Sequence, residues 1–160
     1  MPNKLLASDV TIAVETYDQI IDDLKPLLTE HWRELALYQD EIPLDPDYDG
    51  YKRICDAGVT MVTSVRVAGA LVGYAVYVLQ PHMHYRGHRW AVSDLFWLHP
   101  DHRSMGLGNA LFAFIEDALR ERGVDVMHTT FKKHFPAAGM LLESRGHAMV
   151  ELGYSKRLRQ

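Results

Sequence analysis

Cysteine is nearly missing from this sequence, which contains Cys55 alone. One thiol can form neither an intrachain disulfide nor a cysteine zinc cluster, so we expect a reduced, cytoplasmic protein. Long hydrophobic runs are also missing, because the longest, Leu71 to Leu79, falls far short of the ~20 residues that span a bilayer. No apolar stretch of a secretory signal follows Lys4. We therefore expect no membrane partner.

Positive charge is the third shortage. The 17 lysines and arginines are outnumbered by 21 acidic residues, and the formal net charge is -4. Proteins that bind nucleic acid usually carry a basic surface, so a nucleic-acid partner is disfavoured. The 160 residues, 48% of them hydrophobic, contain no linker, repeat or low-complexity segment. This length and composition suit a single folded domain over residues 1–160.

Hydrophobic periodicity predicts short strands that alternate with amphipathic helices. Strands are expected at Val10–Val14, Val59–Val65, Leu71–Leu79, Trp90–Leu98, Val124–Thr130 and, as one strand or a bent pair, His147–Leu158. Helices are expected behind Thr16 up to Leu35, at Tyr51–Ala57, around Leu107–Leu119 and at Pro136–Arg145. Thr16 and Gln19 match a capping box, whereas Pro26 should kink or split the helix that follows. The order predicts an α/β protein of the α+β type, a mixed sheet with helices on its faces.

The stretch Arg-Ser-Met-Gly-Leu-Gly at 103–108 has the features of an anion site. It follows a strand that ends at Leu98 and a His-Pro-Asp turn, and it begins a helix. Backbone N–H groups at a helix start have no partner within the helix, and the helix dipole makes that end positive. Gly106 and Gly108 let a phosphate approach the backbone, and Arg103 adds a positive charge. Taken alone, the two glycines fit a tight strand-to-helix turn equally well.

The pattern Arg103-x-x-Gly106-x-Gly108 resembles the acyl-CoA-binding motif Gln/Arg-x-x-Gly-x-Gly/Ala of the GNAT N-acetyltransferase superfamily. The resemblance covers most of the chain, and some segments look similar to small acetyltransferases encoded by phages. It implies a central mixed, mostly antiparallel sheet flanked by helices, with splayed fourth and fifth strands. It also implies acetyl-CoA as acyl donor, with the pyrophosphate on the motif and the pantetheine arm along the fourth strand. The implied cofactor-binding residues are Phe96, Trp97, Leu98, Arg103, Ser104, Met105, Gly106, Leu107, Gly108 and Asn109.

The same resemblance implies direct attack of an amine on the thioester in a ternary complex. Asp94 matches an acid that often serves as general base, although a solvated strand acid or an arginine partner is the plainer interpretation. His84 is the second candidate base, unless it merely belongs to a polar loop at a sheet edge. No third ligand joins His82 and His84, so we expect no metal.

One departure from the family pattern concerns the general acid. Leu142 stands where the family often has a tyrosine that protonates the leaving thiolate. Tyr154, Tyr85 or solvent is left for that step. Two functions therefore stay open: an N-acetyltransferase for a primary amine of a small molecule or protein, and a catalytically silent CoA-binding protein. The acidic residues of 40–49 either attract a cationic amine or are simply solvated. Dimers are common in the family, so a homodimer is expected.

Overall fold

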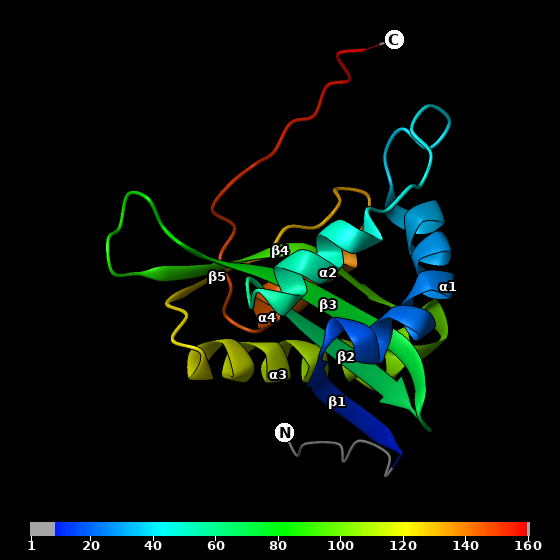
Figure 1. The fold of residues 1–160 in the computed structure, drawn as a ribbon, viewed down its shortest axis with the longest axis horizontal. Coiled ribbons are helices and arrows are strands. Elements are labelled where there is room, and N and C mark those ends of the chain that lie inside the picture. Colours follow the sequence, from blue (N-terminus) through cyan, green and yellow to red (C-terminus); the bar gives the residue numbers. More distant parts are fainter. Residues whose placement is uncertain (1–8, 160) are drawn as a thin grey trace. The chain divides into compact units, whose positions relative to one another are not determined.

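The computed structural model describes residues 9–159, which divide into two compact units. The unit that ends at Thr130 contains β1 (Val10–Glu15), α1 (Tyr17–Leu35), α2 (Tyr48–Asp56), β2 (Thr60–Val67), β3 (Ala70–Pro81), β4 (Arg89–Leu98), the 3-10 helix η1 (Pro100–Met105), α3 (Leu107–Glu121) and β5 (Val126–His128). The unit that starts at Phe131 contains α4 (Pro136–Ser144) (Figure 1).

The five strands of the first unit form one sheet in the order β1-β2-β3-β4-β5. The first three pairs are antiparallel and the last, between β4 and β5, is parallel. A tight turn joins β2 to β3, with positive φ at Ala68 (49°) and Gly69 (83°). The predicted mixed, mostly antiparallel sheet is therefore confirmed.

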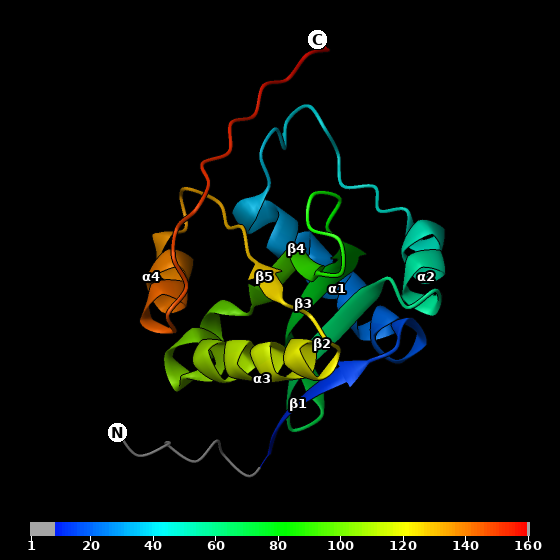
Figure 2. The same cartoon turned by 90° about the vertical axis from the view of Figure 1, so that its left-hand side faces the viewer.

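Helices cover both faces of this sheet (Figures 1 and 2). On one face, Ile20 and Leu24 of α1 pack with residues of β2, β3 and β4. That cluster is completed by Val62, Leu71, Tyr74, Val76 and Trp97. On the other face, α3 contacts β1 and β2 and buries its apolar stripe, which includes Leu107, Leu111, Phe112, Ile115 and Leu119. Both helices hide one stripe and expose the other, as amphipathic helices do.

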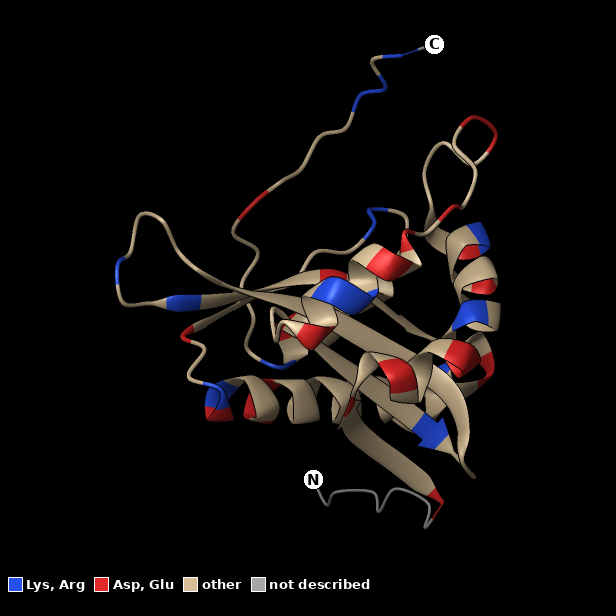
Figure 3. Ribbon diagram, in the orientation of Figure 1, with Lys and Arg blue, Asp and Glu red and all other residues tan. Residues whose placement is uncertain are grey.

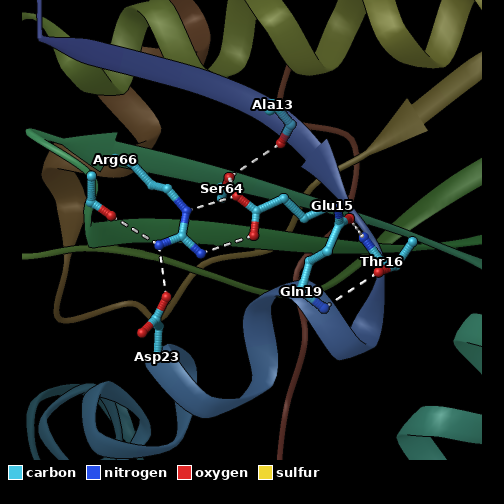
Figure 4. Close-up of polar contacts among 8 residues, drawn as sticks. Ala13, Glu15, Thr16, Gln19, Asp23, Ser64 and Arg66 are labelled. Carbon is cyan, nitrogen blue, oxygen red and sulfur yellow. Dashed lines mark hydrogen bonds and ion pairs between the residues drawn. The ribbon is translucent and has the colours of Figure 1, made fainter.

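The start of α1 follows the sequence prediction. The Gln19 N–H donates to the Thr16 hydroxyl at 3.3 Å, and the Thr16 N–H donates to the Gln19 side chain at 2.8 Å. This reciprocal capping box is confirmed (Figure 4). Of the two effects predicted for Pro26, a kink or a split, the split is wrong, because α1 runs as one element through the proline. Packing of the apolar stripe offsets the hydrogen bond that a proline cannot make.

Two strand predictions need correction. The fifth strand is shorter than expected, at Val126–His128 instead of Val124–Thr130. The strand expected over 147–158 is absent from the described residues of that stretch. A strand needs a neighbour for its N–H and C=O groups, and the unit from Phe131 offers only α4.

One arginine ties β1, β2 and α1 together (Figure 4). The Arg66 guanidinium donates to both oxygens of Glu15, at 2.7 and 3.0 Å, and to Asp23 at 2.7 Å. The Ser64 hydroxyl donates to the same Glu15 carboxylate at 2.6 Å. Only 12% of the Glu15 side chain is exposed, so water cannot readily replace these partners.

We expect Glu15→Gln to lower the free energy of unfolding at pH 7 by about 1–3 kcal/mol, since it removes one charge of a largely buried pair. The hydrogen bond from Arg66 holds the pKa of Glu15 below its ordinary 4.5. The stabilisation is therefore present above pH 4.5 and is lost as pH falls through the lower folded-state value. Urea unfolding of both proteins at several pH values measures this. A difference that stays constant down to pH 2 would contradict it.

Candidate active site

A β-bulge in β4 presents Asp94. Tyr77 of β3 lies opposite Ser93, but the preceding residue, Val76, lies opposite Leu95. Asp94 is thus the extra residue of β4, and it is exposed. Bulges are frequent beside active sites because they redirect one side chain without ending the strand.

The Asp94 carboxylate is held from α2. The Tyr51 hydroxyl donates a hydrogen bond to Asp94 Oδ2 at 2.7 Å. Burial, together with this hydrogen bond, raises the pKa of Tyr51 far above its ordinary value of 10. The phenol therefore stays protonated at neutral pH and remains a donor to the carboxylate.

The fourth and fifth strands separate beyond Ser93. Backbone pairing joins β5 only to Trp90–Val92. One step further, the Thr130 N–H donates to the Ser93 hydroxyl at 2.9 Å. Past this point no described strand pairs with β4 on that side. Residues 94–98 therefore offer a free backbone edge to which an extended ligand with amide groups can add.

This edge continues directly into a helix start. The His99 N–H donates to the Val72 carbonyl at 2.8 Å, after which the chain enters η1 and then α3. Gly106 separates the two helices with φ 75° and ψ 6°, a left-handed conformation that favours glycine. No side chain within residues 9–159 caps α3, so its first N–H groups are directed outward along the axis. Such a helix start is suited to a phosphate.

The predicted cofactor residues of β4 differ in what they offer. The Trp97 side chain is 3% exposed and belongs to the core on the α1 side. The Phe96 ring packs edge-to-face on Phe112 of α3, with 5.3 Å between ring centres. These side chains serve the core, so the part of Phe96–Leu98 left for a ligand is the backbone.

The Arg103 guanidinium forms hydrogen bonds with other residues of this chain. Its Nε donates to the Leu98 carbonyl at 2.8 Å, and its two Nη atoms donate to the Glu34 carboxylate at 2.6 and 2.7 Å. Glu34 also accepts from Trp97 Nε1 at 2.7 Å. We name this arrangement of Glu34, Arg103 and Trp97 the Glu34 clamp; it joins α1, β4 and η1.

His84, the second predicted base, lies in another part of the first unit than Asp94. His84 lies in the β3–β4 connection, where its N–H donates to His82 Nδ1 at 3.2 Å. Asp94 lies five positions along β4 from Arg89 at the hairpin end, roughly 16 Å of strand. Tyr154 belongs to the second unit and is 95% exposed.

Sequence reasoning missed Tyr51 and Glu34. Their hydrogen bonds to Asp94 and Arg103 bridge 43 and 69 residues of chain. Neither residue stands in a recognisable motif, so no local signal marks it. Only the pairing of distant elements reveals these contacts.

A sequence profile described as the Acetyltransferase (GNAT) family matches residues 18–147. The chain belongs to this family. GNAT acetyltransferases use acetyl-CoA as acyl donor, so the predicted N-acetyltransferase activity and its donor are confirmed at the level of the family. Nothing found favours the catalytically silent alternative. No curated protein matches the chain in a sequence search.

Solved structures show the same GNAT fold. A ribosomal-protein-alanine N-acetyltransferase from Brucella melitensis biovar Abortus 2308 is 23% identical, with TM-score 0.72 and coverage of 94% of this chain and 99% of the other. An aminoglycoside acetyltransferase from an uncultured soil metagenomic sample, in complex with sisomicin, is 12% identical, with TM-score 0.75 and coverage of 94% and 97%. AAC(6')-Iy with a bisubstrate CoA analogue is 16% identical, with TM-score 0.66 and coverage of 96% and 100%.

Two further features of the described residues concern membranes and metals. None of the helices described has the length and apolar character required of a membrane span. Likewise, no three His, Cys, Asp or Glu side chains in the described part of this GNAT protein are grouped to hold a metal ion.

We expect Ser93→Ala to loosen the point where β4 and β5 separate. The Thr130 N–H would lose its acceptor in a partly buried site, at a cost of about 1–3 kcal/mol in unfolding free energy. Hydrogen exchange at Thr130 should become faster in the variant. Ser144→Ala, which removes an exposed hydroxyl from α4, is the control and should leave Thr130 unchanged. Equal exchange at Thr130 in Ser93→Ala and wild type would refute the expectation.

Proposed function

We propose that this GNAT protein transfers the acetyl group of acetyl-CoA to a primary amine of a small molecule or protein, within one ternary complex. One observation carries the proposal: the free edge of β4 leads, through the short helix η1, to the uncapped start of α3. An extended amide chain followed by a diphosphate, which is the order of groups in CoA, matches these two stretches. When bound, acetyl-CoA supplies an activated acetyl thioester.

The cofactor contacts that we propose are mainly to the backbone. N–H groups of Ser104–Asn109 hold the diphosphate, and Gly106 leaves open space where another residue would carry a Cβ. The backbone of Phe96–Leu98 pairs with the pantetheine arm. The N–H near Leu98 polarises the thioester carbonyl, as an oxyanion hole does.

Asp94 is the proposed general base. An ammonium group has no lone pair, so an acceptor amine must lose a proton before it attacks. The exposed Asp94 carboxylate takes this proton through water, while Tyr51 fixes its orientation. His84 remains the second candidate, from a position beyond the hairpin end. The thiolate is protonated by Tyr154, Tyr85 or solvent, since Leu142 occupies the family's tyrosine position.

A cationic amine is the acceptor that the charges near Asp94 favour. The connection between α1 and α2 and the start of α2 carry the exposed acids Asp40, Glu41, Asp45, Asp47 and Asp49 (Figure 3). The bond from Tyr51 to Asp94 brings α2 beside the bulge. Clusters of one charge sign raise the local concentration of an oppositely charged substrate. Aminoglycosides and peptides with N-terminal alanine, suggested by the structural neighbours, are therefore the first acceptors to try.

Three broader expectations belong to the same proposal. The two units together make one GNAT domain, since the family match at 18–147 crosses their boundary at Thr130. The protein works in the cytoplasm, which agrees with its single cysteine. It forms a homodimer without a nucleic-acid partner, and light scattering tests the dimer.

We expect Gly106→Asp to weaken acetyl-CoA binding about tenfold or more relative to Gly106→Asn. Both side chains tolerate the left-handed backbone, so the pair differs in charge alone. Only the aspartate repels a diphosphate at this helix start. Isothermal titration measures both dissociation constants. Equal dissociation constants for the two variants would show that the diphosphate does not bind at this helix start.

We expect Asp94→Asn to lower turnover by about 100-fold or more, the range for a lost general base, with unchanged acetyl-CoA affinity. Release of CoA would be followed with sisomicin, a peptide with N-terminal alanine, and spermidine as acceptors. Asp22→Asn on the exposed side of α1 is the matched control and should keep full turnover. Full turnover in Asp94→Asn would exclude Asp94 as the base.

A further inference from the structure

The Glu34 clamp gives the arginine of the cofactor motif a different partner from the one that the sequence predicts. The sequence motif predicts the Arg103 charge at the rim of a phosphate site. In the structure, the guanidinium forms a two-pronged ion pair with Glu34, and its Nε donates to the Leu98 carbonyl. Both side chains are largely buried, at 29% and 26% exposed. Paired in this way, the arginine adds little net positive charge to the loop.

The same carboxylate also fixes β4. Glu34 Oε2 accepts from both Trp97 Nε1 and Arg103 Nη2, at 2.7 Å each. His31, one turn earlier on α1, stacks on the Trp97 ring and contacts the Tyr74 hydroxyl at 2.8 Å. Hydrogen bonds from Arg103, above all, keep the pKa of Glu34 below its ordinary value, so the carboxylate stays charged at neutral pH.

The clamp stands between the two halves of the proposed cofactor site. Leu98 is the last residue of the β4 edge, and Arg103 lies in η1, which leads to Gly106 and α3. The hydrogen bond from Arg103 to the Leu98 carbonyl joins η1 to the end of β4. Glu34 on α1 fixes the Arg103 side chain in that position. A ligand that contacts both the strand edge and the helix start requires a fixed distance between them.

We propose that Glu34 is a positioning residue for acetyl-CoA: through Arg103 and Trp97 it fixes the spacing between the β4 edge and the α3 start. This inference rests on the proposed cofactor site. In this proposal Arg103 holds the connection between β4 and η1 in place, and backbone N–H groups alone bind the diphosphate.

The alternative, in which Arg103 contacts the diphosphate directly, predicts the opposite sign for one variant. If Arg103 were a phosphate ligand, Glu34→Gln would release it and remove a negative charge, so acetyl-CoA would bind equally well or more tightly. If Glu34 positions the loop, the same variant binds acetyl-CoA more weakly, despite the more favourable overall charge. Trp97→Phe separates the two further, because it removes only the indole donor to Glu34 and leaves the Arg103 charge untouched.

The test is isothermal titration of the full chain with acetyl-CoA at a temperature where each variant is folded. We expect Glu34→Gln and Trp97→Phe each to weaken binding about tenfold, the equivalent of one lost charge-assisted hydrogen bond. The double variant should bind no more weakly than the weaker single one, since both act through one contact. Hydrogen exchange over residues 99–106 should rise in Glu34→Gln.

Glu15→Gln is the matched control. It removes the same charge from a comparably buried two-pronged pair, with Arg66, on another part of the sheet. It should lower stability without weakening acetyl-CoA binding, which separates general destabilisation from positioning.

The outcomes distinguish this inference from the proposed function. Wild-type affinity or tighter binding in Glu34→Gln overturns the clamp and leaves the cofactor site in place. Additive losses in the double variant also overturn it. If Glu34→Gln does not fold, Trp97→Phe decides: weaker acetyl-CoA binding supports the clamp, and wild-type affinity overturns it. If the wild-type protein does not bind acetyl-CoA, the proposed cofactor site is refuted, and the positioning role of Glu34 is refuted with it.

Discussion

The site depends on the unequal pairing of β4 with its two neighbours. Its antiparallel ladder with β3 runs from Arg89 to Leu98, whereas its parallel ladder with β5 covers only three residues. Backbone groups in a sheet must find partners, and the missing part of the second ladder is what a ligand can supply. The bulge, the free edge and the entry into α3 all lie on this one strand. The enzyme therefore needs β4 to be fixed firmly on one side and left open on the other.

Helix α1 helps to fix the position of β4, through ion pairs as well as apolar packing. Its first half reaches Arg66 through Asp23, and its last turns reach Arg103 and Trp97 through Glu34. Ile20 and Leu24, on either side of Asp23 in sequence, pack in the core. Paired, hydrogen-bonded charges are costly to separate once buried, as Glu34 and Arg103 largely are, whereas apolar contacts alone permit small shifts. One ion pair in each half of α1 therefore helps to define how the helix lies along the sheet.

Local chemistry could be predicted from the sequence, and distant pairing could not. The capping box at Thr16, the strand pattern and the glycine before α3 are encoded within a few residues, and each was found. Asp94 was recognised as a strand acid, but a bulge depends on the register with β3 and leaves no local pattern. Tyr51 and Glu34 act across long stretches of chain, so their partners follow only from the fold. The strand expected over 147–158 shows the converse, since a stretch of chain without a partner strand forms no ladder.

The bulge also separates one exposed side chain from the packing of β4. Ser93 and Leu95 keep the positions opposite Tyr77 and Val76 that a regular strand would give to consecutive residues, and Asp94 is inserted between them. The core thus assigns no packing role to the inserted side chain, which is exposed. A substitution at this position therefore leaves every buried side chain of β4 on its own face. The residue proposed as base can in this sense be varied independently of the residues that stabilise the strand.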